Sequence, residues 1–149
     1  MRFTLDSNVL VYAYDEAAGS RHAIALALLE RAFQADLVIT IQSLAELFHV
    51  LTRKGKLPAD HARQVVARLA GTAEVIAADE ECLFSAMTMV ARHQWSFWDA
   101  MMFATARQAG CALLVSEDGQ DRRHLDGLTI VNPFTDTPSP LLYEALAPA

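Results

Sequence analysis

Acidic side chains follow two short apolar runs in this sequence. Asp6 comes directly after residues 3–5 (Phe-Thr-Leu), and Asp118 comes shortly after residues 112–115 (Ala-Leu-Leu-Val). Both runs have the length and apolar character of buried strands. Ligands of open α/β sheets bind beyond the carboxyl ends of the strands, so we expect these two carboxylates to face the same end of a sheet.

Two further acids belong to expected helices. Asp99 begins a helix that continues to Ala109 and leads into the 112–115 run, so its first turn can approach the same sheet edge. Glu46 lies in a helix, expected between residues 42 and 54, whose other side chains are largely apolar. Four carboxylates can therefore converge at one end of the sheet.

A cluster of carboxylates needs a cation. At about 4 Å, two like charges repel by about 4 kcal/mol even at an effective dielectric constant near 20. Hard oxygen ligands without His or Cys suit Mg²⁺ or Mn²⁺. In paired-metal sites such ions activate water and stabilise the leaving oxygen of a phosphodiester, so no His base is required. This chemistry would be metal-dependent phosphodiester hydrolysis.

Each acid also has an ordinary structural interpretation. Asp6 and Asp99 can be helix N-caps, and Asp118 can belong to an Asp-Gly turn. Glu46 can be a solvated helix residue. Periodicity alone leaves both interpretations open.

Strands and helices alternate along the chain. Strands are expected at residues 3–5, 37–40, 74–77, 112–115 and 128–131, with helices that include 20–35, 42–54, 65–69, 82–90 and 100–109. The alternation predicts an α/β fold of three layers, α/β/α, with helices on both faces of a mainly parallel sheet of four to five strands.

Length and composition indicate one folded domain spanning residues 1–149. Hydrophobic residues make up 53% and charged residues 20%, which is the balance of a folded protein and not of a disordered one. Residues 135–149 contain three prolines and are expected to form a loosely packed tail. The start of the chain lacks the apolar run of a signal peptide, and no stretch approaches the roughly 20 apolar residues of a membrane span. We expect a cytoplasmic protein without a membrane partner.

The net charge of −6 argues against a protein that coats nucleic acid through its overall field, but it is compatible with a local basic patch. Five basic residues flank the expected acidic site: Arg53, Lys54 and Lys56 at the end of one helix, and Arg122 and Arg123 after the Asp118 turn. Such side chains can grip the phosphates of RNA, or they can be solvated surface groups.

Four motifs resemble, in this order, the acidic motifs of PIN domains. They are Leu5-Asp6-Ser7-Asn8-Val9-Leu10, Leu44-Ala45-Glu46-Leu47, Phe97-Trp98-Asp99-Ala100 and Leu114-Val115-Ser116-Glu117-Asp118. The likeness spans most of the chain, and residues 128–134 resemble the closing strand of VapC-like toxins, the PIN ribonucleases of bacterial toxin-antitoxin modules. Each motif alone is weak, whereas four at these positions are strong.

The resemblance implies a PIN-like fold and a Mg²⁺-dependent endoribonuclease, with Mn²⁺ as the alternative ion, that cleaves structured cellular RNA as a toxin. It implies that the acids are both catalytic residues and metal ligands, namely Asp6, Glu46, Asp99 and Asp118. Asn8 and Ser116 match supporting polar positions. Asp121 is a candidate outer carboxylate, with a turn or salt-bridge role as the alternative.

The resemblance also implies two protein partners, a small antitoxin and a second copy of the chain. An antitoxin segment would lie across apolar helices and present a basic side chain to the acids. The candidate groove is formed by Tyr12, Tyr14, Leu26, Leu29 and Phe48.

Other interpretations compete with a toxin nuclease. A PIN nuclease that processes RNA outside any toxin module, or an inactive PIN-fold binding module, would carry the same fold. Glu46 and His49 have the spacing of a di-iron helix, but the chain lacks the second copy that such a site needs. Trp95 and Trp98 can stack on a base or can simply pack at the start of a helix.

Overall fold

In a computed structural model that describes all 149 residues, six strands form one sheet in the order β3-β2-β1-β4-β6-β5. The strands are β1 (Phe3–Leu5), β2 (Leu37–Thr40), β3 (Glu74–Ile76), β4 (Leu113–Val115), β5 (His124–Leu125) and β6 (Leu128–Val131). All neighbours run parallel except β5 and β6, which form an antiparallel hairpin. The expected α/β fold with a mainly parallel sheet is confirmed. The expected strand count was too low, because β5 is only two residues long and has no apolar pattern of its own.

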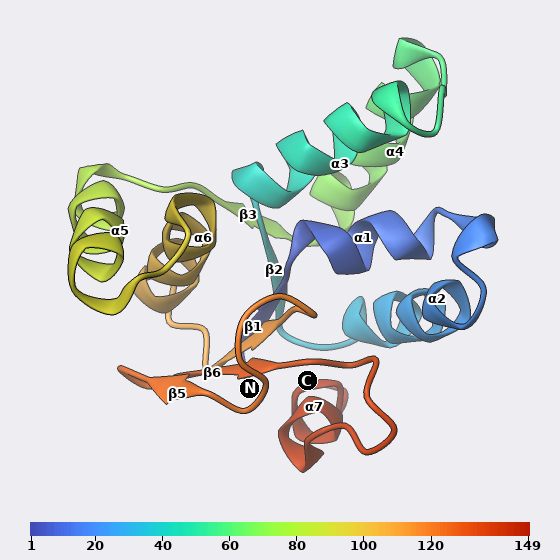
Figure 1. Cartoon of the computed structure of the whole chain (residues 1–149). Helices are drawn as coiled ribbons and strands as arrows, with labels where there is room; N and C mark the ends of the chain where they lie inside the picture. Colours follow the sequence, from blue (N-terminus) through green and yellow to red (C-terminus); the bar gives the residue numbers. More distant parts are fainter.

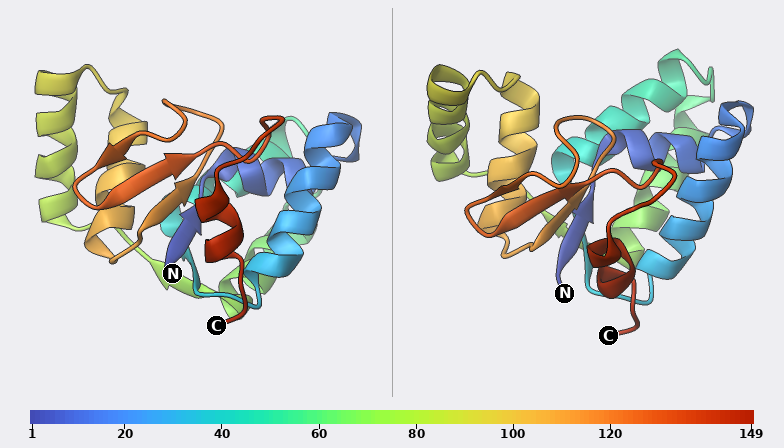
Figure 2. Two further views of the ribbon diagram at one scale, coloured as in Figure 1. Left: turned by 90° about the horizontal axis from the view of Figure 1, so that it is seen from below. Right: turned by 60° about the horizontal axis from the view of Figure 1, so that its bottom comes forward.

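Helices cover both faces of the sheet. They are α1 (Ser7–Ala13), the 3₁₀ turn η1 (Glu16–Ala18), α2 (Ser20–Ala32), α3 (Ile41–Arg53), α4 (Ala59–Thr72), α5 (Glu80–His93), α6 (Phe97–Gln108) and α7 (Pro140–Ala145). Figures 1 and 2 show α5 and α6 on one side of the sheet and the remaining helices on the other. No helix combines the length and the apolar character that a membrane crossing requires.

The core has two parts, one on each face of the sheet. Along β4, Leu113 and Val115 belong to the cluster on the α1–α4 side, whereas Leu114 belongs to the cluster beneath α6. Successive strand residues point to opposite faces, so a strand buried on both faces must be apolar at every position. All three β4 side chains are accordingly buried.

The C-terminal segment differs from our expectation of a loosely packed tail over residues 135–149. Helix α7 buries Leu142, Ala145 and Leu146 against the core on the α1–α4 side. Pro140 lies at the start of this helix, where its fixed φ favours helix formation and its missing N–H costs nothing. The prolines therefore delimit a packed element.

Candidate functional site

The centre of the sheet has the topology that creates a ligand site. Strands β1 and β4 are neighbours, but the chain continues from β1 toward β2 on one side and from β4 toward β6 on the other. The loops that leave their carboxyl ends diverge, and a crevice opens between them. The Asp6 N–H donates to the Val115 carbonyl at 2.9 Å, so the first of these loops begins against the end of β4.

Asp6 is held in place by α1 and by the loop after β4. It is the N-cap of α1, and its Oδ1 accepts from the Ser7 backbone N–H at 2.7 Å. Its Oδ2 accepts from the Ser116 hydroxyl at 2.7 Å. The side chain is buried, and its loss of hydration, together with the smaller effect of the negative charges of Glu46 and Asp118, raises the pKa of Asp6 to about 6 despite these hydrogen bonds. Asp6 is therefore both a cap and a member of the site.

Asp118 is positioned by the two residues that the motifs marked as supporting. Its backbone N–H donates to the Ser116 hydroxyl at 3.0 Å, and its Oδ2 accepts from the Asn8 amide at 3.1 Å. The Ser116 hydroxyl thus contacts both Asp6 and the Asp118 backbone. These contacts fix two carboxylates from different loops relative to each other.

Asp99 reaches the same site from the first turn of α6. The N-cap of this helix is Ser96, whose hydroxyl accepts from the Asp99 backbone N–H at 3.4 Å. The interpretation of Asp99 as a cap is therefore wrong, since its carboxylate has no capping role. The side chain instead lines the hollow that Asp6 and Asp118 share.

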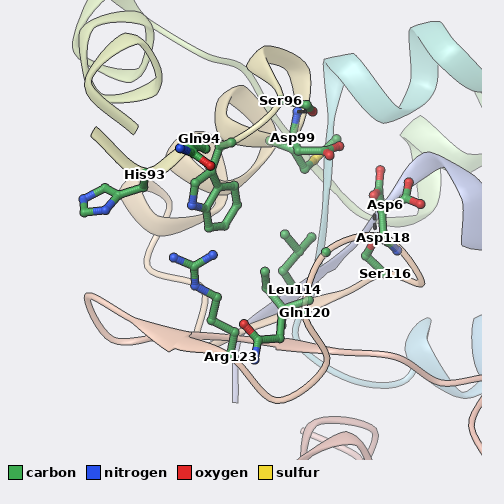
Figure 3. Close-up of a pocket in the computed structure, with 14 residues that line it drawn as sticks. Asp6, His93, Gln94, Ser96, Asp99, Leu114, Ser116, Asp118, Gln120 and Arg123 are labelled. Atoms are coloured by element: carbon green, nitrogen blue, oxygen red, sulfur yellow. Dashed lines mark hydrogen bonds between the residues drawn. The ribbon is translucent and has the colours of Figure 1, made fainter. Parts of the chain in front are cut away.

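The carboxylates of Asp6, Asp99 and Asp118 lie close together (Figure 3). One carboxylate oxygen from each residue can be chosen so that all three oxygens lie within 4.8 Å of one another. None of these carboxylates takes part in the ion pairs of the structure. Three close carboxylates without a positive partner suit a bound cation, and a donor set made only of oxygen suits Mg²⁺ or Mn²⁺.

Glu46 lies beside this cluster and not within it. Its carboxylate accepts from the Ser7 hydroxyl and, at 3.0 Å, from the Gln42 amide. Ser7 also donates its backbone N–H to Asp6, so it connects the two acids. The structure therefore brings three of the four predicted acids together, and the fourth, Glu46, is separated from Asp6 by the side chain of Ser7. Sequence reasoning missed Ser7 because a serine after an N-cap is unremarkable without knowledge of its partner.

The predicted basic residues are dispersed. Arg123 lines the hollow of the acids, whereas the Arg122 guanidinium donates to the Thr137 carbonyl at 2.8 Å. The side chains of Arg53, Lys54 and Lys56 are exposed at the end of α3 that is far from the acids. Lys54 is the only one of the three that lines a hollow, and this second hollow runs along α1. Asp121 accepts from the Asn132 backbone N–H at 2.8 Å, which favours its structural role in the turn.

The hollow of the acids encloses about 210 Å³ and extends beyond them. Figure 3 shows the carboxylates at one end and the side chains of His93, Gln94 and Arg123 at the other, with Leu114 and Gln120 between. The site is thus acidic at one end and basic at the other.

The fold is shared with toxins of known structure. VapC20 from Mycobacterium tuberculosis, a toxin that cleaves the Sarcin-Ricin loop, is 24% identical with a TM-score of 0.66, over 78% of this chain and 90% of that one. A toxin-antitoxin complex from Klebsiella pneumoniae is 20% identical with a TM-score of 0.64, over 88% and 97%. VapBC2 from Rickettsia felis, bound to a promoter DNA fragment, is 20% identical with a TM-score of 0.62, over 87% and 97%. These identities make the likeness evidence for the fold alone.

No curated protein sequence matches the chain. The family model of the PIN domain matches residues 3–126, a range that contains β1 to β5 and all the acids described above. The chain belongs to the PIN domain family.

Proposed function

We propose that this PIN domain is a Mg²⁺-dependent endoribonuclease and the toxin of a toxin-antitoxin module. The observation that carries the proposal is the cluster of Asp6, Asp99 and Asp118, whose carboxylate oxygens approach within 4.8 Å without any positive partner from the chain. Such an arrangement is electrostatically unfavourable unless a cation binds, so a use for the cation explains it. The similar structures of toxins support the biological role.

The residues of the chain have distinct roles in this proposal. Asp6, Asp99 and Asp118 would hold the cation, and Ser116 and Asn8 orient two of these carboxylates. Glu46, which accepts from the Ser7 hydroxyl, adds negative charge near Asp6. A divalent ion bound there would supply a nucleophile from water at neutral pH and would offset charge on the phosphodiester. The absence of a His from the cluster is compatible with this chemistry, since the ion replaces a general base.

The proposed substrate is a structured cellular RNA. Sequence-specific recognition of RNA mostly targets unpaired loops, bulges and ends, and the small hollow suits a scissile phosphate from such a segment. One similar protein is a toxin that cleaves the Sarcin-Ricin loop, which supports an RNA substrate here.

The proposed antitoxin site is the hollow along α1. It encloses about 580 Å³, is lined by Tyr12, Tyr14 and Lys54, and reaches Ser7 and Asn8 beside the acids. Of the predicted groove residues outside it, Leu26 and Phe48 are partly exposed, whereas Leu29 is buried in the core. A segment lying along α1 would end at the acids, where a basic side chain would be stabilised. Several solved relatives are toxin-antitoxin complexes.

A second copy of the chain is a further proposed partner. Helix α5 exposes Phe84 and Met87, which are 56% and 49% accessible, and such apolar side chains favour association. Sedimentation of the purified protein tests this, since a monomer at all concentrations would contradict a dimer.

The decisive experiment is RNA cleavage by purified protein. Wild type should cleave with Mg²⁺ and not with EDTA, and Asp6→Asn and Asp99→Asn should each abolish cleavage while the protein remains folded. Asp136→Asn is the matched control, because Asp136 is an exposed carboxylate outside the site. Cleavage that survives EDTA, or an active Asp6→Asn protein, would contradict the proposal. Cleavage without any small partner in the native host would favour an RNA-processing enzyme, and no cleavage at all would favour a binding module.

A further inference from the structure

The basic end of the hollow contains a hydrogen-bond donor without an acceptor. Trp95 lies in the connection between α5 and α6, half-buried, with its ring 5.0 Å from the ring of Phe103. Its Nε1 is buried and has no hydrogen-bond partner. Trp95 lines the hollow, and buried polar groups are nearly always hydrogen-bonded, so its unpaired N–H indicates an acceptor that the chain itself does not supply.

Arg123 provides further unfilled donors at the same place. Its guanidinium carbon lies 4.8 Å from the centre of the Trp95 ring, within the range of a cation–π contact. None of the ion pairs of the structure involves Arg123, and its side chain makes no hydrogen bond, although three carboxylates line the other end of the hollow. The backbone is anchored, since the Arg123 carbonyl accepts from the Ile130 N–H at 2.9 Å. The planar guanidinium of Arg123 is therefore held against the Trp95 ring, and the N–H groups of the guanidinium are free to donate.

These donors determine which group fits. Trp supplies one N–H and no acceptor, and Arg supplies a rigid pair of N–H groups and no acceptor. A matching ligand must present adjacent acceptors in a plane. Guanine does so on its Hoogsteen edge, through O6 and N7, which is the pair that a bidentate Arg contacts most often; the Hoogsteen edges of adenine and cytosine present an amino donor, and that of uracil a single oxygen.

The size of the hollow gives a second constraint. Its volume of about 210 Å³ is below the roughly 300–1,000 Å³ of typical small-molecule sites, which is the scale of a single base. In A-form RNA the Hoogsteen edge lies in a deep, narrow groove that side chains do not reach. A base bound here must be unpaired.

We propose that the basic end of the hollow, formed by Trp95, Arg123, Gln94 and Gln120, binds an unpaired guanine next to the phosphodiester that is cut at the acids. This guanine pocket rests on the proposed function, because it assumes an RNA substrate. The single hollow joins the two ends, so one RNA strand can place a phosphate at Asp6, Asp99 and Asp118 and an adjacent base on Arg123 (Figure 3).

Binding measurements test the pocket separately from cleavage. The protein carries Asp6→Asn to prevent turnover, and the probes are two labelled single-stranded RNAs of adenosines with either one central guanine or one central 7-deazaguanine, which lacks the N7 acceptor. We expect the guanine probe to bind about tenfold more tightly, the discrimination typical of a lost bidentate contact. Equal affinities for the two probes would overturn the proposal.

Variants of Arg123 and Trp95 test whether these two residues cause the preference for guanine over 7-deazaguanine. Arg123→Ala should remove it, and Arg123→Lys should also remove it while keeping the charge, since Lys lacks the planar fork. Trp95→Phe keeps an aromatic ring beneath Arg123 but removes the N–H together with part of the indole, so it should weaken guanine binding severalfold. Arg122→Ala is the matched control, because that guanidinium is bonded to the Thr137 carbonyl outside the hollow. A preference that survives in Arg123→Lys, or a Trp95→Phe protein with unchanged affinity, would overturn the assignment.

The two proposals fail in different ways. If wild type cleaves RNA with Mg²⁺ but shows no preference for guanine over 7-deazaguanine, the pocket is wrong and the nuclease stands. If the Asp6→Asn protein prefers guanine but wild type does not cleave, the pocket stands and the proposed nuclease is wrong.

Discussion

Replacing Asp6 with Asn should make the metal-free protein more stable at neutral pH. The carboxylate is buried, with 8% of its residue surface exposed, and burial is the main reason that its pKa rises from 3.8 to about 6. Asn has the same shape, its carbonyl can accept from the Ser7 N–H, and its amide can donate to Ser116. The substitution therefore removes the buried charge and retains the bond from the Ser7 N–H, while the bond with Ser116 reverses its direction.

The direction of the pH effect follows from proton binding. Between pH 3.8 and about 6 the folded state holds more protons at Asp6 than the unfolded state, so the free energy of unfolding falls as the pH rises through this window. Below the window the charge is absent from both states and there is no cost. Above it the cost is complete, and a pKa rise of this size corresponds to about 3 kcal/mol.

Thermal melting with EDTA at several pH values measures this cost. For a chain of this length about 3 kcal/mol corresponds to roughly 6–12 °C, so Asp6→Asn should melt higher than wild type by up to that amount at pH 7 and by almost nothing near pH 3.5. Mg²⁺ at a hundredfold excess over its Kd should stabilise wild type by about 2.7 kcal/mol and the variant far less. A variant that melts lower than wild type at pH 7, or a difference independent of pH, would refute the reasoning.

Further substitutions separate the roles of other residues. Ser116→Ala removes a contact with Asp6 and one with the Asp118 backbone, so the cleavage rate should fall about 10–100-fold with the fold intact; an unchanged rate would contradict its orienting role. Leu142→Ala should lower the free energy of unfolding by about 2–5 kcal/mol without altering the Mg²⁺-induced stabilisation, whereas a negligible loss would mean that α7 is loosely packed. Replacing Arg53, Lys54 and Lys56, at and just beyond the end of α3, should reduce the salt dependence of RNA binding by about one unit per lost phosphate contact, and an unchanged slope would show that they are solvated.

The sequence was sufficient to predict the central strands because they are buried on both faces. Leu113 to Val115 form a continuous apolar run, whereas an amphipathic helix would alternate apolar and polar residues; β1 and β6 differ from this run by one buried Thr each. The missed strand β5 is half exposed and depends on pairing with β6, which is a tertiary effect. Helix α7 was missed because three prolines outweighed the apolar spacing of Leu142 and Ala145.

The site was only partly predictable for a related reason. Strand ends mark Asp6 and Asp118, but nothing local shows that Ser96 and not Asp99 caps α6, since both residue types are good caps. Glu46 lies outside the cluster because of where α3 packs and because its carboxylate accepts from the Ser7 hydroxyl, and both are tertiary effects that the local sequence does not show. Arg122 and Arg123 are neighbours in sequence, and only the β5–β6 hairpin directs one to the hollow and the other to Thr137.

The central claim is that RNA cleavage requires a cation bound by the three clustered acids. The most direct test is a titration of wild type and Asp99→Asn with Mn²⁺, with cation binding measured by calorimetry and RNA cleavage measured in the same buffer. We expect the Mn²⁺ concentration for half-maximal cleavage to match the one for half-saturation in wild type, and Asp99→Asn to weaken binding and abolish cleavage together. Cleavage that is maximal before the cation binds, or that persists in Asp99→Asn, would contradict the claim.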